Sequence, residues 1–478
     1  MLNNAGLVQL AKFGIPIVIV IWILGYLTSE REAYTTIVKT RFKSEKEKFI
    51  ADFLDNEVGS EFNGAGIAHA CAQQTWTPGL ILSCVPVDGG YAKVKNGHLN
   101  CIRFAMEMGG KYFNYYYCYY YYYHYLENMN KASPDIPIPP SAELVLPRIV
   151  KRDQKNVAVT RPKNGKGPYV GELLEYLFDY EHLNATLSLH CPQMKLYKSM
   201  DDLWDVPQVS PPKKISLSLI ETHITNGTVV QDMAKLSDQI KTYINKTAPP
   251  ETRRMPIRFE LDATNHAFPV DYDAPEFANS FGRLLRPRSD ARALAAAALY
   301  NLSKRFGLVS LPSRNIQNNG FAGVHLRTEA DAVGYPNFDT QVGALLRFAR
   351  DVEARLLFLA TGTTPREIKA FTERAQAANL TAITKKDLLD DEDAPLLQAM
   401  TWDQRALVDY EIMLRAGSFA GPVESGFSWN LAVTRSTVPG AAEAAAAPVS
   451  GLVQYRDAYS AVMGSLDRGY TMKATIWP

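Results

Sequence analysis

The chain has 478 residues, of which 46% are hydrophobic and 21% charged, and its formal net charge is +1 at pH 7. This length and apolar content are enough to bury two cores of ordinary domain size. The balanced charge lacks the basic footprint of a nucleic-acid-binding protein.

Near the N-terminus, residues 13–27 form an uninterrupted apolar run, FGIPIVIVIWILGYL, after a tail that contains Lys12. As a helix this run spans roughly 22 Å, which is short for an average bilayer but close to the thickness of an early-secretory membrane. A cleavable signal peptide is the alternative, because such apolar regions have about 7–15 residues. Since no convincing small-x-small cleavage site follows, we expect a cytosolic tail (1–12), an uncleaved transmembrane signal anchor (13–27) and a charged stem (28–60).

The charges on either side of the apolar run do not settle its orientation. Acceptor sequences for N-glycosylation occur in the body of the chain, at Asn184, Asn226, Asn245, Asn301 and Asn379. Each alone is common by chance. Together with an anchor they favour a single-pass type II membrane protein whose body lies in the lumen of the ER or Golgi.

Residues 110–141 form a low-complexity segment with a run of tyrosines followed by a Pro/Ile tract. We hypothesise a retained intron that is translated in frame, because Gly110-Lys111-Tyr112 can be encoded by the sequence of a fungal intron donor. A genuine low-complexity loop is the alternative.

Cysteine content agrees with a secretory compartment. If the low-complexity segment is spurious, Cys118 is lost with it, and an even set of four remains: Cys71, Cys84, Cys101 and Cys191. Such a set suits an oxidising lumen. Our guess for the pairing is Cys71 with Cys84 and Cys101 with Cys191, and free buried thiols are the alternative.

The C-terminal part alternates between strand and helix patterns. We expect strands over 321–326, 355–360 and 380–384, helices over 340–354, 365–378 and 404–416, and a Gly/Ser-rich turn over 417–426. Alternating strands and helices predict a parallel sheet covered on both faces, so residues 313–478 are expected to form a Rossmann-like domain.

The first of these strands ends in a polar cluster of His325, Arg327, Glu329 and Asp331. Ligands of open α/β sheets bind outside the carboxyl ends of strands, and a guanidinium there presents forked donors to a phosphate or carboxylate. Arg327 is therefore the first candidate anion ligand. The alternative is an arginine that pairs with Glu329 or Asp331 at a strand end.

These residues resemble a known family. His325-Leu326-Arg327 and Glu424-Ser425-Gly426-Phe427-Ser428 are similar to the donor-site motifs of the GDP-fucose protein O-fucosyltransferases, and the chain most resembles fungal members of that superfamily. The resemblance extends to Cys71 to Leu80, Asp88-Gly89-Gly90-Tyr91, Leu99 to Ala105, Leu146-Pro147-Arg148-Ile149, Phe178 to His182 and Cys191-Pro192-Gln193.

The resemblance implies a GT-B-like α/β fold, with an N-terminal Rossmann-like domain (61–312) facing the C-terminal, donor-binding one across a cleft. It implies a glycosyltransferase that moves fucose or a related sugar from a GDP-sugar to a hydroxyl of a glycoprotein or glycan. No cofactor is expected, because fixed donors can replace a metal at the leaving diphosphate. Arg327 would hold that diphosphate, and the groups expected to bind the donor with it are Gly89, Gly90, Asn96, His325, Ser425, Phe427 and Ser428.

The chain departs from the family in its N-terminal glycine turn. Relatives commonly carry Gly-Gly-x-Gly-Asn, whereas this chain has Gly89-Gly90-Tyr91-Ala92-Lys93. Lys93 is either a phosphate contact or a solvated surface residue, and we favour the latter. The alternative function is therefore a catalytically weak relative that binds nucleotide sugar or glycan without turnover.

The general base is not identified by the sequence. Glu329 and Asp331 are candidates because they follow Arg327 closely, but both could instead orient that arginine, which we favour. The spacing of Asp271 and Asp273 matches manganese-binding sugar transferases, yet its Pro-rich and aromatic setting favours a surface loop. A di-iron oxidoreductase is set aside because the chain contains no Glu-x-x-His, and a structural role in the secretory pathway is the remaining alternative.

Overall fold

The computed structural model describes residues 44–59, 61–74, 76, 80–109, 142–152, 171–203, 209–215, 222–225, 228–231, 238, 242, 245, 246, 256–261, 268–309, 316, 320–441, 446, 449–464 and 472–478. Two compact units divide the chain, Met1–Asp52 and Phe53–Pro478. The first contributes the start of helix α2 (Glu45–Asp55), and all the described strands belong to the second. The predicted anchor (13–27) and insertion (110–141) lie outside the described residues, within which no helix is both long enough and apolar enough to cross a membrane.

The N-terminal half of the second unit contains a parallel sheet. Its described strands are ordered β3-β2-β1-β7-β4, and all four pairings are parallel. The strands are β1 (Leu80–Cys84), β2 (Ala142–Val145), β3 (Met194–Tyr197), β4 (Val209–Ile215) and β7 (Ile257–Leu261), and β5 (Thr222–Thr225) pairs separately with β6 (Thr228–Gln231). The described helices of this half are α3 (Ala65–Ala72), α4 (Tyr91–Gly109), α6 (Tyr180–His190), α8 (Pro275–Phe281) and α9 (Ser289–Phe306).

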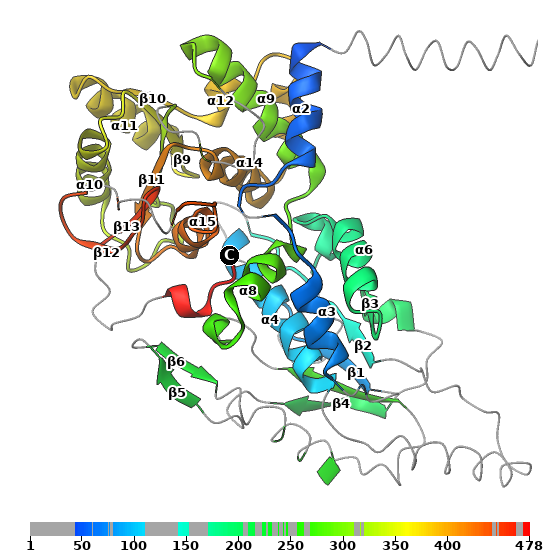
Figure 1. The fold of residues 1–478 in the computed structure, drawn as a ribbon. Coiled ribbons are helices and arrows are strands. Elements are labelled where there is room, and N and C mark those ends of the chain that lie inside the picture. The colour runs from blue at the N-terminus through cyan, green and yellow to red at the C-terminus, as the bar shows by residue number, and fades with distance from the viewer. Residues whose placement is uncertain are drawn as a thin grey trace, which may run out of the picture. The chain divides into compact units, whose positions relative to one another are not determined.

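The C-terminal half contains a second sheet, ordered β10-β9-β8-β11-β13-β12 (Figure 1). All its pairings are parallel except that of the edge strand β12. The strands are β8 (Ala322–His325), β9 (Leu356–Ala360), β10 (Thr381–Ile383), β11 (Ser418–Pro422), β12 (Val453–Arg456) and β13 (Ser460–Met463). The helices are α10 (Phe338–Asp351), α11 (Pro365–Ala377), α12 (Lys385–Leu388), α13 (Ala394–Ala399), α14 (Trp402–Leu414) and α15 (Gly426–Arg435).

The prediction of an α/β fold with parallel sheets is confirmed. In the C-terminal half the order of the parallel strands runs outward from β8 in one direction and from β11 in the other, which is the Rossmann arrangement with its switch point between these two strands. The predicted helices and strands up to residue 416 are present with ends shifted by a few residues.

The expected Gly/Ser-rich turn over 417–426 is wrong, because its first part is the central strand β11. Phe419 and Ala420 are fully buried between β8 and β13. Gly421 allows close packing there, since a Cβ at this position would collide with the hydroxyl of Ser428. Small residues that usually indicate a turn are thus required by a strand that is covered on both faces.

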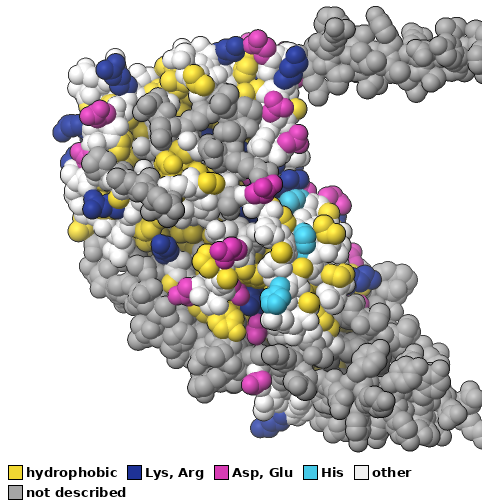
Figure 2. All heavy atoms as spheres, viewed as in Figure 1, with side chains coloured by type: hydrophobic (Ala, Val, Ile, Leu, Met, Phe, Trp, Pro, Cys, Tyr) yellow, Lys and Arg dark blue, Asp and Glu magenta, His cyan; other side chains and the backbone are white. Residues whose placement is uncertain are grey.

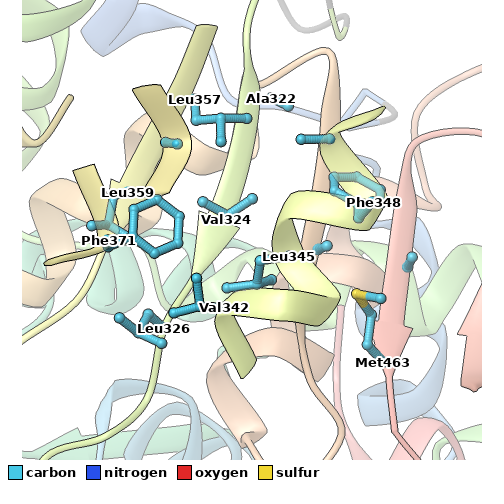
Figure 3. Close-up of a cluster of buried hydrophobic side chains, with 14 of the residues drawn as sticks. Ala322, Val324, Leu326, Val342, Leu345, Phe348, Leu357, Leu359, Phe371 and Met463 are labelled. Carbon is cyan, nitrogen blue, oxygen red and sulfur yellow. The ribbon is translucent and has the colours of Figure 1, made fainter. Parts of the chain in front are cut away.

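A cluster of buried side chains joins α10 and α11 to one face of the C-terminal sheet (Figure 3). Val324 of β8 and Leu359 of β9 pack there with Leu345 and Phe348 of α10. On β13, Met463 belongs to this cluster, whereas the preceding residue, Val462, packs with α15 in another. Because successive strand residues point to opposite faces, α10 and α15 cover opposite faces of the sheet.

Helix α4 contacts α14 and α15 as well as β1 and β2, so it links the two halves. The C-terminus of the chain ends beside it (Figure 1), where Lys95 Nζ donates to the carbonyl of Pro478 at 2.8 Å. Trp477 is fully buried, and its ring N–H donates to Asn100 at 2.8 Å.

Two disulfides use the four predicted cysteines, but the guessed pairing is wrong. Cys71 bonds Cys191 and Cys84 bonds Cys101, with Cα–Cα distances of 5.5 and 6.2 Å. The reason lies in the packing of the helices. Helices α3 and α6 are neighbours, and α4 returns along β1 so that its middle lies against the end of that strand.

The expected stem (28–60) reaches into the second unit, where Phe53 and Val58 are buried and the guanidinium of Arg415 lies 3.6 Å from the centre of the Phe53 ring. Helix α9, assigned to the N-terminal domain, packs against α12 and α14. Acidic and basic side chains are interspersed over the face in Figure 2, in agreement with the balanced net charge.

Candidate functional site

A cavity of about 520 Å³ lies where the carboxyl ends of strands from both sheets meet. It is lined by residues that follow β1, β2, β8, β9, β10 and β11. The segments after β8 and β11 flank the switch point of the C-terminal sheet, the place where open α/β sheets bind ligands. Its volume is within the range of small-molecule and nucleotide sites, about 300–1,000 Å³.

Arg327, two residues beyond β8, lies in this cavity with its side chain 13% exposed. Its Nη1 donates to Glu329 Oε2 and its Nη2 to Asp331 Oδ1, both at 2.6 Å. Burial alone would lower the pKa of Arg327, but the two carboxylates outweigh it and raise that pKa. The guanidinium therefore remains a cation at every physiological pH.

The carboxylates of Glu329 and Asp331 differ in how firmly they are held. Glu329 is buried, and its second oxygen accepts the backbone N–H of Gly362 at 2.6 Å. Gly362 is needed at this turn, because a Cβ would lie within 3 Å of both Glu329 and Trp402. Asp331 is 22% exposed and reaches across the cavity to a second arginine. Both carboxylates accept a hydrogen bond from the guanidinium of Arg327.

That second arginine, Arg152, was not identified from the sequence. It follows β2 of the N-terminal sheet, and its Nη1 donates to Asp331 Oδ2 at 3.2 Å. Its Nε and Nη2 both donate to Asp403 Oδ1, and its guanidinium lies 5.1 Å from the centre of the Trp402 ring. Burial raises the pKa of Asp403, an effect that Arg152 opposes.

His325 is the last residue of β8 and is buried. Its Nδ1 lies 3.0 Å from Ser428 Oγ and 3.5 Å from Ser425 Oγ, and its ring is 4.8 Å from that of Phe427. Burial and the nearby charge of Arg327 lower the pKa of His325 to about 3. The imidazole is thus neutral and positions the loop between β11 and α15.

Helix α15 begins at the cavity. Ser425 is its N-cap, and its hydroxyl accepts the N–H of Ser428 at 3.4 Å. Gly426 and Phe427 line the cavity, whereas Ser428 lies just behind it. The first N–H groups of a helix have no partner within the helix and form the positive end of its dipole, so this end favours an anion.

The N-terminal glycine turn also reaches the cavity. Gly89 has φ +119°, a conformation that side chains rarely adopt, and a Cβ at Gly90 would lie 3.1 Å from Arg152 Nη2. Helix α4 begins directly afterwards with Tyr91. Lys93 lines the cavity with its side chain 41% exposed, and it donates to Asp88 at 2.8 Å.

Asn96 is placed differently from the expectation that it contacts a donor. It is buried on α4, where its amide donates to the carbonyl of Thr475 at 2.8 Å and accepts the N–H of Trp477 at 3.1 Å. One further turn of α4 separates it from the cavity lining, so its hydrogen bonds go to the C-terminal segment.

Other cavity residues were missed by the sequence reasoning. Lys385 of α12 pairs with Asp409 of α14, and burial raises the pKa of that carboxyl to about 6 against the opposing effect of the lysine. The hydroxyl of Tyr335 donates to the carbonyl of Glu424 at 3.0 Å, and its ring centre is 5.9 Å from the Arg327 guanidinium. The position of Lys385 in the sequence could have indicated it, because Lys385 directly follows the strand predicted over 380–384 and ligands bind at the carboxyl ends of parallel strands.

The remaining predicted sites lie elsewhere. Asp273 accepts two hydrogen bonds from Arg103, each 2.9 Å, and the described residues contain no group of His, Cys, Asp and Glu side chains that could hold a metal ion. Asn245 and Asn379 are exposed, Asn184 is half-buried on α6, and Asn226 lies outside the described residues. The amide of Asn301 donates to the carbonyl of Leu388 at 2.8 Å.

Several solved structures resemble the chain. POFUT1 in complex with GDP-fucose, in two crystal forms, is 14% and 13% identical over 76% of this chain and 96% of POFUT1, with TM-scores of 0.38 and 0.39. A variant of Arabidopsis thaliana FUT1 in complex with GDP is 9% identical over 77% of this chain and 71% of FUT1, with a TM-score of 0.34. No protein-family model and no curated protein sequence matches the chain.

Proposed function

We propose that the protein is a glycosyltransferase that moves fucose, or a related sugar, from a GDP-sugar to a hydroxyl of a glycoprotein or glycan. The observation that carries the proposal is the meeting of Arg327 with the N-terminus of α15 at the switch point between β8 and β11. A guanidinium, which presents two parallel N–H donors, and a helix N-terminus together form a site for a diphosphate. The identities of the nucleotide and the sugar are inferred from two motifs, residues 325–327 and 424–428, which resemble the donor-site motifs of the GDP-fucose protein O-fucosyltransferases.

The charges of the cavity lining support an anionic ligand. Its basic side chains outnumber the acidic ones, six to four. The basic residues are Lys93, Arg152, Arg327, Lys385, Lys386 and Arg405, and the acidic ones are Glu329, Asp331, Asp409 and Glu424. We propose that fixed cations and backbone N–H groups take the charge of the leaving group, so that no metal cofactor is required.

The transfer itself is a substitution at the anomeric carbon. The oxygen of the acceptor hydroxyl forms a bond to this carbon, and the bond from the carbon to the diphosphate oxygen breaks. The electron pair of that bond leaves with the diphosphate as GDP, and the hydroxyl proton passes to a base or to solvent. Arg327 stabilises the charge that develops on the departing oxygen, an interaction stronger in the transition state than in the ground state.

The alternative function is a protein that binds nucleotide sugar without turnover. It is favoured by the altered glycine turn, where Lys93 is paired with Asp88 and Asn96 is bonded to the C-terminal segment. Both functions require a GDP-sugar to bind in the cavity, and only the first requires its sugar to be transferred to an acceptor with departure of GDP.

The test is a donor turnover assay. Purified protein is incubated with GDP-fucose, with and without candidate glycoprotein acceptors and a metal chelator, and free GDP is measured. We expect release that the chelator leaves unchanged and that Arg327→Ala lowers by about 10²–10³-fold. Arg374→Ala is the control, because this arginine pairs with Asp339 on the exposed surface. Tight GDP binding with no release would select the alternative function.

For the cellular location we propose the ER or Golgi membrane, with the body in the lumen. Two disulfides and the exposed acceptors Asn245 and Asn379 support an oxidising, glycosylating compartment. Digestion of the cell-expressed protein with an N-glycosidase tests this directly. An unchanged electrophoretic mobility would contradict the luminal assignment.

A further inference from the structure

Asp331 bridges two arginines that follow strands of different sheets. Its Oδ1 accepts from Nη2 of Arg327, which follows β8, at 2.6 Å, and its Oδ2 accepts from Nη1 of Arg152, which follows β2, at 3.2 Å. One carboxylate, with one oxygen for each guanidinium, thus occupies the space between the two cations. All three side chains line the cavity.

The two carboxylates on Arg327 are not equivalent. Glu329 has a side chain only 3% exposed, and its oxygens are held by Arg327 and by the backbone N–H of Gly362. Asp331 has a side chain 22% exposed, and the hydrogen bonds just described join it to guanidiniums. An anion from the cavity can accept the two N–H groups that Asp331 accepts, whereas replacing Glu329 would also break its hydrogen bond with the backbone N–H of Gly362.

Both arginines have partners other than Asp331. Arg327 retains its bond to Glu329. Arg152 retains Asp403, which accepts its backbone N–H at 2.9 Å and two of its side-chain N–H groups, and the ring of Trp402 lies against its guanidinium. The site is therefore preorganised for a ligand that carries two neighbouring anionic groups.

We infer that the ligand's diphosphate binds between Arg152 and Arg327, in the position that the carboxylate of Asp331 occupies in this structure. The diphosphate displaces this carboxylate when it binds. The inference rests on the proposed function for the identity of the nucleotide. The diphosphate itself is recognised by the two guanidiniums of Arg152 and Arg327, which we call the clamp. Asp331 then acts as an internal competitor that weakens diphosphate binding. Arg152 is a specificity residue of the site, supplied by the opposite sheet.

The test is a calorimetric titration of Asp331→Asn with GDP, inorganic pyrophosphate and guanosine. We expect GDP and pyrophosphate to bind about 10-fold more tightly than to the unmodified protein, because the competing charge is gone, and guanosine affinity to be unchanged. Adding Arg152→Ala should abolish the gain in a double-mutant cycle. Asp331→Ser is the second variant, and thermal unfolding checks that each variant folds.

Asp339→Asn is the matched control for net charge. Asp339 is exposed on α10, where it pairs with Arg374, and it is not among the residues that line the cavity. The control should gain less than about two-fold, as expected for a charge change acting at a distance.

The possible results separate the two proposals. Tighter binding of pyrophosphate and GDP by Asp331→Asn, beyond the gain of Asp339→Asn, supports the inference. Unchanged or weaker diphosphate binding by folded Asp331→Asn and Asp331→Ser would overturn it, even if the unmodified protein binds GDP as the proposed function requires. A gain for pyrophosphate with no preference for GDP would support the clamp and contradict the GDP-sugar function.

Discussion

Gln341 on α10 holds the backbone of Arg327 through two reciprocal hydrogen bonds. The Gln341 side chain accepts the Arg327 N–H at 3.0 Å and donates to the Arg327 carbonyl at 2.7 Å. The primary amide pairs with the backbone as a neighbouring strand would, at the point where β8 has ended. Helix α10 thereby fixes the direction in which the Arg327 side chain leaves the sheet.

We expect Gln341→Ala to destabilise the protein by about 1–3 kcal/mol, because it leaves the backbone groups of Arg327 without partners. GDP binding should weaken as well, since the guanidinium is no longer positioned. Chemical denaturation and GDP titration measure the two effects. Gln376→Ala, on the exposed side of α11, is the control and should change neither. A loss of stability with unchanged GDP affinity would contradict the positioning role.

The buried imidazole of His325 predicts a dependence of stability on pH. Its pKa is about 3 in the folded protein, against an ordinary value of 6.5, so between these values the unfolded chain binds a proton that the folded protein does not. The contribution of the neutral imidazole to the free energy of unfolding is complete above pH 6.5. It is lost as the pH falls toward 3, by up to about 1.4 kcal/mol per pH unit.

The comparison with His325→Gln isolates this contribution. The difference in unfolding free energy between the unmodified protein and the variant should shrink as the pH is lowered from 6.5 to 4. Denaturation series at several pH values measure it. A difference that stays constant or grows would show that the folded protein accommodates the charged imidazole.

The two disulfides should contribute unequally to stability. Their sequence separations are 120 residues for Cys71–Cys191 and 17 for Cys84–Cys101. In the chain-entropy model, loops of these lengths correspond to about 5 and about 3 kcal/mol. Replacing each pair by alanine and measuring the unfolding free energy tests the order. A larger loss for the shorter loop would mean that native packing, and not the loop, sets the contribution.

The strand–helix alternation from residue 321 onward was predictable because each element there has a clear period and an ordinary end. Thr364 before Pro365 caps α11, and Asn337 caps α10. Strand β11 was not recognised because Gly421 and Ser418 are typical of turns when neighbouring strands are unknown. Its identity depends on β8 and β13, whose positions only the tertiary fold supplies.

The candidate site was predictable only where its residues are local in sequence. Arg327, Glu329 and Asp331 follow one strand, and their contacts with one another could be expected. Arg152 could not be, because its partner Asp331 is 179 residues away. For the same reason the cysteine pairing and the contacts of Asn96 depend on how separate elements pack.

Gly421 provides a test of the close contact between β11 and α15. In Gly421→Ala the new methyl group would collide with the Ser428 hydroxyl and lie 3.2 Å from the Cβ of His325. Since these atoms belong to the packed core, we expect a loss of about 1–3 kcal/mol and weaker GDP binding. Gly343→Ala, on α10 where the nearest atom is the tip of Arg347, should be tolerated. Equal stability of the two variants would contradict this packing.

Whether the cavity is a GDP site that depends on Arg327 can be decided by calorimetric titration with GDP, with UDP as the competing nucleotide and Arg327→Ala as the variant. We expect saturable binding of GDP with one site per chain and a preference over UDP. The variant should lose at least about 30-fold in affinity, the cost of removing a buried cation that pairs with the diphosphate. Folded, cooperatively unfolding protein that binds no GDP, or binds it equally well without Arg327, would contradict the proposed donor site.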